Sequence, residues 1–414
     1  MDDVLDEFPA PVQERITGTW AALPTEMRMQ LADVMGDFSP SLKVLRGLLP
    51  LVLEHYKPAF GQKHSIAIVG PANVGKSTLY NQLISRGEEK AEVSSIPGTT
   101  RQNQEADAGL FVVVDTPGAD AVGAVGEQER QIAFEAAGTA DFLVVMFEAT
   151  RGIKQSERAL FNDLLELGKP FIVVLNKMDL IGKAERDEVL VVAARNLELE
   201  PSELIDMVAT EGDNVERVIL AIAKSDPELV SAIAEALPEF RARLVWQRTA
   251  AAAGSAGAIG WIPLPFADLV PLLVIQSGLV LSIARIYGYE ITLARAKELI
   301  ATFGLGFAAR TLYQQLSKLG GVPGWILSAA IAAATTVAMG YGAMMWFGYG
   351  EKPTRESLQR TAAEVAIRLR DQLLGLGEKR PDRGTVRQRI RLALKEIPDR
   401  FHPRHRENAV EEEE

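Results

Sequence analysis

The sequence contains no cysteine, and this absence removes several classes of chemistry at once. A chain without thiols forms no disulfide, iron–sulfur cluster or thiolate zinc site, and it has no cysteine nucleophile. Histidine is also scarce, and His402 and His405 are too isolated to suggest a metal site. The first residues, MDDVLDEFPAP, lack the basic and apolar regions of a secretory signal. We therefore expect the first half of the chain to stay in the cytoplasm.

Positive charge is in the minority, with 44 basic against 55 acidic residues and a net charge of -11. This balance argues against a protein that coats nucleic acid with its whole surface. Charge is nearly absent from two long stretches: residues 250–284 contain only Asp268, and residues 320–350 contain no charged residue. Both stretches are long enough for a membrane span.

The 414 residues predict more than one domain. We expect an N-terminal helical segment over 1–61, in which Ser39 and Pro40 open a helix that Pro50 interrupts. This helix packs on a neighbouring domain or docks on a membrane or partner. A nucleotide-binding α/β domain is expected over 62–225, an apolar helical domain over 226–350, and further helices with a basic tail over 351–414.

Short apolar runs alternate with helical patterns in the second segment, which predicts a parallel sheet with helices on both faces. The expected strands are 65–69, 110–115, 142–147, 171–175 and 204–208. The runs at 142–147 and 171–175 are apolar without alternation, as central strands covered on both sides require.

The run GPANVGKST follows the first expected strand and fits the phosphate-binding pattern G-x-x-x-x-G-K-[ST]. Its glycines permit a tight loop whose N–H groups surround phosphates. Lys76 is expected on the β- and γ-phosphates and Ser77 on Mg²⁺. Taken alone, the run leaves a chance match or an ATPase open. The expected nucleotide contacts in this loop are Gly70, Asn73, Val74, Gly75, Lys76, Ser77 and Thr78.

Two further motifs end later strands. In DTPG, Asp115 is expected to hold Mg²⁺ through water, and Gly118 to present its N–H to the γ-phosphate. In NKMD, Asp179 can accept the N1–H and exocyclic amine of guanine, a donor pair that adenine lacks. Asn176 is expected to hold the loop and the edge of the base, and Lys177 to lie along the ring of the base. The predicted ligand is therefore GTP or GDP with Mg²⁺.

The four motifs GxxNxGKS, PGTTR, DTPG and NKMD together resemble the Era, Der and TrmE group of bacterial P-loop GTPases. The resemblance implies that Thr100, rather than Thr99, completes a Mg²⁺ shell with Ser77 and Asp115. It implies catalytic roles for Lys76, Thr100 and Gly118. The similarity also suggests that Asn73 helps bind K⁺, although Asn can merely brace the loop.

Two positions depart from this pattern. Ala119 follows DTPG and cannot orient water, so we expect slow intrinsic hydrolysis that a cation, a partner or self-association accelerates. Val208 stands where the family usually has serine, and Ala209 is expected to offer its backbone N–H to the guanine oxygen. TrmE-like tRNA modification is disfavoured because the C-terminal cysteine of that enzyme is absent.

The apolar second half predicts either a membrane-associated hairpin or the buried helices of a soluble domain. The runs IPLPFADLVPLLVIQ, GVPGW and TTVAMGYG resemble the YcjF-like domain of unknown function, which is assigned to bacterial inner membranes. In the tail, a helix over 385–397 is expected to set an apolar group against a basic one: Val386, Ile390, Ala393, Leu394 and Ile397 against Arg387, Arg391 and Lys395. Solvent, anionic lipid and RNA phosphate all remain possible partners of this helix.

Together these patterns predict an α/β P-loop GTPase domain followed by a largely apolar, all-α domain. The predicted function is GTP hydrolysis as a switch at the cytoplasmic face of the bacterial inner membrane. A homodimer through either domain is compatible with this prediction. The alternative is a soluble RNA or ribosome-assembly GTPase, although we find no KH-like GXXG loop in a suitable context.

Overall fold

The computed structural model describes residues 65–84, 110–116, 134–261, 269–289, 322–377 and 381–395. The predicted N-terminal segment, Thr100, Gly118 and Ala119 lie outside these ranges, as does Ile397 of the tail. Only the backbone of Asp115 is described. The contacts divide the chain into two units, with the boundary between Arg241 and Ala242, and each unit is treated by itself below.

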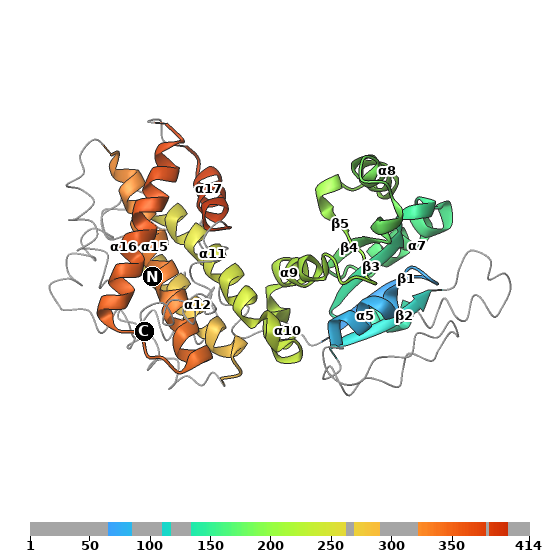
Figure 1. The fold of residues 1–414 in the computed structure, drawn as a ribbon, viewed down its shortest axis with the longest axis horizontal. Coiled ribbons are helices and arrows are strands. Elements are labelled where there is room, and N and C mark those ends of the chain that lie inside the picture. Colours follow the sequence, from blue (N-terminus) through green and yellow to red (C-terminus); the bar gives the residue numbers. More distant parts are fainter. Residues whose placement is uncertain are drawn as a thin grey trace, which may run out of the picture. The chain divides into compact units, whose positions relative to one another are not determined.

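The first unit is built on five parallel strands in the order β2-β1-β3-β4-β5, which Figure 1 shows side by side. The strands are β1 (Ile66–Pro71), β2 (Phe111–Thr116), β3 (Phe142–Glu148), β4 (Phe171–Asn176) and β5 (Leu204–Asp206). All five predicted strands are confirmed. The last one is shorter than predicted, because Val208 leaves the sheet and pairs with Asp213 in an isolated antiparallel bridge.

Helices cover the sheet on both faces, as predicted. The described helices that cover it are α5 (Lys76–Ile84), α7 (Gln155–Glu166), α8 (Arg186–Leu197) and α9 (Val215–Ser225). On one face, Val145 and Val173 form a core with Phe161 of α7 and Ala194 of α8. Helices α5 and α9 contact each other and the strands β1 and β4, respectively. The central strands are therefore buried on both sides, which explains their continuous apolar sequences.

Short 3₁₀ turns connect these elements: η2 (Ala149–Arg151), η3 (Met178–Leu180), η4 (Pro201–Glu203), η5 (Pro227–Leu229) and η6 (Pro238–Phe240). The Asp226 side chain accepts from Glu228 N at 3.1 Å and caps η5, which leads into α10 (Val230–Ala236). Contacts group this segment with the sheet. The boundary between the units therefore lies later in the chain than the predicted boundary at residues 225 and 226.

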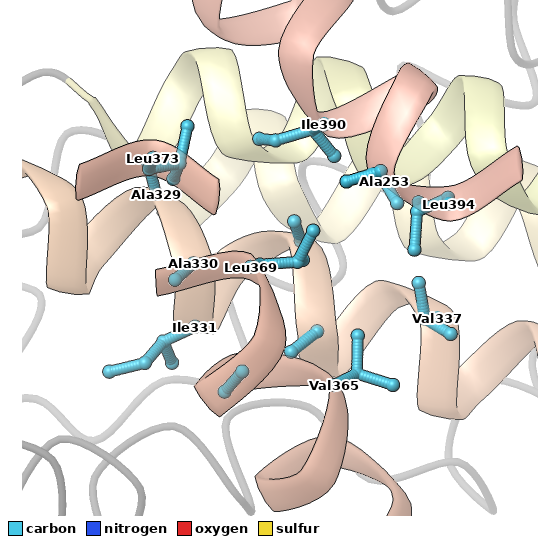
Figure 2. Close-up of a cluster of buried hydrophobic side chains, with 14 of the residues drawn as sticks. Ala253, Ala329, Ala330, Ile331, Val337, Val365, Leu369, Leu373, Ile390 and Leu394 are labelled. Carbon is cyan, nitrogen blue, oxygen red and sulfur yellow. The ribbon is translucent and has the colours of Figure 1, made fainter. Parts of the chain in front are cut away.

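The second unit is helical where it is described, as predicted. Its helices are α11 (Arg241–Gly260), α12 (Leu269–Ile286), α15 (Gly324–Tyr349), α16 (Arg355–Leu374) and α17 (Arg383–Lys395). Its core is made of aliphatic side chains from α11, α15, α16 and α17, several of which Figure 2 shows facing one another. Three tryptophans, Trp246, Trp261 and Trp325, pack against this core.

Small residues let these helices approach closely. A Cβ added at Gly257 of α11 would lie 2.2 Å from Ile390 Cδ1 of α17, and one at Gly260 would lie 2.7 Å from Ser328 O of α15. Similarly, a Cβ at Gly340 of α15 would lie 2.4 Å from Thr249 Oγ1 of α11. The small residues that predicted close helix packing therefore serve contacts inside the unit.

The basic helix of the tail is α17, and its apolar face is not free. Val386, Ile390, Ala393 and Leu394 are buried in the core of the unit. Lipid anchoring through this apolar face, one of the three interpretations of the tail, is therefore not supported by the structure. The exposed side of α17 carries Leu392 and Lys395.

Helix α15 is the one described helix that is long and apolar enough to cross a membrane, and 78% of its most apolar window is buried inside the protein. Its 26 residues extend about 39 Å at 1.5 Å per residue. Along α15 lies α16, which buries Val365 and Leu369 and exposes Glu364, Arg368 and Asp371. In this arrangement α15 acts as the central helix of the unit.

Candidate nucleotide-binding site

The loop between β1 and α5 has the backbone geometry that the phosphate-binding motif predicts. Asn73 and Gly75 both have positive φ, at 66° and 98°. Glycine is required at position 75, because a Cβ there would lie 2.3 Å from Asn176 Nδ2. A Cβ at Gly70 would similarly lie 2.3 Å from Met146 O. The loop is therefore folded tightly against the ends of β3 and β4.

Lys76 lies at the start of α5, and its side chain is 3% exposed. Its Nζ donates to Gly70 O at 2.7 Å and to Pro71 O at 2.6 Å. These two carbonyls close the end of β1 and hold the ammonium group inside the curve of the loop. A positive charge and the N-terminus of α5 thus meet at one place, as an anion-binding site requires.

Asn176, the last residue of β4, joins two loops that are distant in sequence. Its Nδ2 donates to Val74 O at 2.8 Å, and its Oδ1 accepts from Ala209 N at 2.9 Å. The side chain is 3% exposed, so both hydrogen bonds are sheltered from water. One amide therefore fixes the phosphate loop to the loop after β5, in agreement with the bracing role predicted for Asn176.

The prediction for Ala209 needs correction. Its N–H was expected to point at the guanine oxygen, but in the structure this group donates to Asn176 Oδ1. The reason is that the chain leaves β5 after Asp206 and passes directly over the end of β4, where Met207 N donates to Leu175 O at 3.0 Å. The donor assigned to the base is thus already used within the protein.

The NKMD loop presents its aspartate to solvent. Met178 is 1% exposed and anchors the turn η3, and its N–H donates to Met207 O at 3.3 Å. Next to it, Asp179 is exposed. No hydrogen-bond or charge partner of the Asp179 carboxylate is found among the described residues. A carboxylate held in this way is available to accept donors from a ligand.

Lys177 turns back toward the sheet. It has a positive φ of 64°, and its Nζ lies 3.0 Å from Glu148 Oε2 at the end of β3. Glu148 also accepts from Thr150 Oγ1 and lies 3.7 Å from Arg151 Nε. Burial alone would raise the pKa of Glu148. The hydrogen bonds from Thr150 and Lys177 and the charges of Lys177 and Arg151 outweigh burial and lower this pKa below its usual value.

Two residues near the site, Glu148 and Gln82, were not predicted from the sequence. Gln82 of α5 donates through Nε2 to Thr210 O at 3.4 Å, and its side chain lies beside Gly212. Helix α5 is thereby linked to the loop after β5. Glu148 could have been predicted from the sequence, because it is an acidic residue at the end of a central strand, and this strand neighbours the one that ends in NKMD.

The predicted magnesium ligands Ser77 and Asp115 are placed at one edge of the sheet. Ser77 lies in the first turn of α5, and the backbone of Asp115 pairs in register with Gly70. A nucleotide fits this edge on three observations: the tight glycine loop, the enclosed Lys76 cation and the exposed Asp179 carboxylate, which has no partner in the described part of the chain. The phosphate and base halves of a nucleotide would thus meet residues from opposite sides of Asn176.

Comparisons with known proteins agree with this geometry. The family model described as 50S ribosome-binding GTPase matches residues 65–177, and the family described as Domain of unknown function DUF697 matches residues 228–371. GTPase Der of Pectobacterium atrosepticum is 30% identical over 198 residues, covering 45% of this chain and 36% of the relative. GTPase Der of Clostridium kluyveri is 38% identical over 126 residues, covering 28% of each chain.

The chain thus spans between 28% and 36% of the length of these relatives. The solved structure of Era in complex with MgGDPNP and nucleotides 1506-1542 of 16S ribosomal RNA is 28% identical, with a TM-score of 0.33. That alignment covers 48% of this chain and 68% of the Era chain. Residues 65–177 of the protein are thus similar to P-loop GTPases and residues 228–371 to the DUF697 domain, and the likeness to TrmE stays a prediction.

Proposed function

We propose that this protein binds GTP and hydrolyses it to GDP and phosphate, and that it acts as a molecular switch at the cytoplasmic face of a membrane. The observation that carries the nucleotide assignment is the position of Asn176. The Asn176 side chain ties the phosphate loop to the loop beside NKMD. The Lys76 ammonium group, assigned to the phosphates, and the exposed Asp179 carboxylate, assigned to the base, therefore lie on either side of this buried amide. Purine recognition and phosphate binding thus share one scaffold.

Each residue has a role that follows from its position. Lys76 carries the positive charge that faces the β- and γ-phosphates, while Asp179 accepts the N1–H and amine of guanine. The Gly118 N–H is assigned to the γ-phosphate. Ser77, Thr100 and Asp115 would hold Mg²⁺, which neutralises charge on the transferred phosphate when bound.

Nucleotide binding is tested by calorimetry on the full-length protein with GTP, GDP and ATP in the presence of Mg²⁺. We expect binding of both guanine nucleotides and at least about 100-fold weaker binding of ATP, because a site built for hydrogen-bond donors rejects a base without them. Lys76→Ala should abolish GTP binding. Failure of the wild-type protein to bind GTP or GDP would overturn the proposal.

Hydrolysis is expected to be slow without help, since Ala119 offers no group to orient water. We propose that K⁺ held near Asn73, or a dimer through the GTPase domain, supplies the missing stabilisation. The positive φ of Asn73 turns the chain at the exposed part of the loop. Replacing KCl by NaCl should lower the rate of phosphate release, and equal rates in the two salts would remove the K⁺ role.

Membrane association rests on α15, whose length exceeds the roughly 30 Å apolar thickness of a bilayer. A span through α15 alone is opposed by α16, because Glu364, Arg368 and Asp371 would accompany it into lipid at a cost of a few kcal/mol each by insertion scales. We therefore propose that the second unit associates with the inner membrane as a packed body, or spans it only after α15 separates from α16.

Fractionation of cells after carbonate and after high-salt washing tests this part. We expect the protein in the membrane fraction after a low-salt wash. Resistance to carbonate would support a spanning α15, and release by carbonate would support association as a packed body. Recovery of the protein in the soluble fraction before any wash would contradict the membrane assignment.

The alternative is a soluble GTPase of ribosome or RNA assembly. It is favoured by the description of the matching family as ribosome-binding and by the positive charge of α17, which carries Arg383, Arg387, Arg389, Arg391 and Lys395 and no acidic residue. Co-sedimentation with ribosomal subunits in GTP but not in GDP would support this alternative over the membrane proposal.

A further inference from the structure

Glu148 is connected to the NKMD motif both through its backbone and through its side chain. Through the backbone ladder, Glu148 pairs in register with Asn176, so β3 and β4 end together. Through its side chain, Glu148 holds Lys177 at 3.0 Å. Two consecutive residues of the guanine motif are therefore attached to one acidic residue that none of the motifs contains.

The pairing restricts Lys177 more than a surface ion pair would. The Glu148 side chain is 11% exposed and the Lys177 side chain is 30% exposed, so the pair is partly shielded from water. Thr150 and Arg151 engage the other oxygen of the carboxylate, which fixes its orientation. A lysine tethered at its ammonium group samples fewer rotamers than a free side chain does.

We infer that Glu148 is a positioning residue for guanine-nucleotide binding: it restricts the Lys177 side chain, so that its methylene groups lie ready against the face of the base. This inference rests on the proposed nucleotide site and adds a residue to it. Glu148 acts through Lys177 and does not itself touch the nucleotide. Glu148 therefore contributes to the affinity for the base, and its contribution does not depend on the number of phosphates in the nucleotide.

A double-mutant cycle on the full-length protein tests the inference. The affinity for Mg²⁺-GDP is measured by calorimetry for the wild type, Glu148→Gln, Lys177→Met and the double variant. Glu148→Gln alone should weaken binding by about 5- to 20-fold, the range of a charge-assisted hydrogen bond discounted for partial exposure. In the Lys177→Met background, the same change should have an effect of less than about twofold, because its target is gone.

A control variant and a second nucleotide distinguish a positioning role of Glu148 from a general loss of structure. Glu198→Gln removes an equally negative side chain that pairs with Arg158 on the surface, and it should leave GDP affinity unchanged. Because the base is held along its ring, Glu148→Gln should weaken GDP and inosine diphosphate by the same factor. An effect passing through Asp179 would instead differ between them, since inosine lacks the exocyclic amine.

The inference is overturned if the two single effects multiply in the double variant, or if Glu148→Gln binds GDP like the wild type. If the wild type itself binds no guanine nucleotide, the proposed function fails, and this result is distinct from failure of the cycle. Should Glu148→Gln lower the melting temperature of the GTPase unit, Glu148→Asp provides a second cycle. It keeps the charge but shortens the side chain, and again it should weaken GDP binding only when Lys177 is present.

Discussion

Replacing Asn176 by alanine removes two buried hydrogen bonds in one step. Val74 O and Ala209 N would both lose their partner, at distances of 2.8 and 2.9 Å in the wild type, and water has little access to either. A buried backbone group left without a partner costs about 1–3 kcal/mol, so the two together give about 2–6 kcal/mol. The GTPase unit should therefore be strongly destabilised by Asn176→Ala.

Urea unfolding followed by circular dichroism measures this loss. With a denaturant slope of about 2 kcal/mol per molar urea, the midpoint of the GTPase unit should fall by about 1–3 M. Asn162→Ala is a matched control, because Asn162 lies exposed on α7 and its loss should change stability by less than about 0.5 kcal/mol.

Hydrogen exchange localises the effect. Peptides covering residues 72–79 and 207–212 should exchange faster in Asn176→Ala, while peptides from α16 should be unchanged. If the midpoint of Asn176→Ala equalled that of the Asn162→Ala control, or if the two loops kept their protection, the bridging role of Asn176 would be refuted.

Three further predictions follow from other parts of the molecule. Asp179→Asn should shift preference from GTP toward xanthosine triphosphate, because an amide can donate to the 2-oxo group of xanthine; unchanged selectivity in a competition assay would contradict the guanine assignment. Gly340→Ala should destabilise the helical unit by about 1–3 kcal/mol in thermal unfolding, because the new Cβ would lie 2.4 Å from Thr249 Oγ1. Gly324→Ala is the control and should be tolerated, since its Cβ would meet nothing within 4 Å. Because the pKa of Glu148 is lowered in the folded state, its stabilising contribution is fully present above the unfolded pKa of 4.5 and is lost as the pH falls through the lower folded pKa. The difference in unfolding free energy between the wild type and Glu148→Gln should therefore be constant from pH 7 to about 5 and shrink below that.

The strands and the phosphate loop were predictable because their signals are local. An apolar run such as that of β3 reports burial on both faces wherever it occurs, and the Gly70–Lys76 spacing fixes a loop through backbone conformations alone. Parallel strands also end at a common edge, so motifs placed after β1, β2 and β4 had to come together.

The remaining contacts depend on which strands are neighbours and in what register. Val74 and Asn176 are 102 positions apart, and nothing in the sequence of either loop states that one side chain reaches the other. The Ala209 prediction was wrong because the exact point at which the chain leaves β5 decides where its N–H groups point. The Glu148–Lys177 pair depends in the same way on the β3–β4 register.

In the second unit, the amino-acid composition predicted the helices but did not predict which parts of the protein pack around them. The uncharged stretch at 320–350 corresponds to α15, but sequence could not show that α16 lies along it with charged residues on its outer side. For the tail helix, the sequence left lipid, solvent and RNA phosphate open as partners, and it did not predict where the apolar residues of this helix would pack. These residues are buried, because Ile390 fits against Gly257 of α11, a glycine far away in the chain.

The tryptophans provide the protein with its own optical reporter. Trp246, Trp261 and Trp325 pack against the core of the helical unit, Trp346 stacks on Phe347 in α15, and residues 62–241 contain no tryptophan. The phosphate loop and the NKMD turn therefore contain no indole of their own. A change in emission when GTP replaces GDP would mean that the identity of the nucleotide is sensed beyond the domain that binds it.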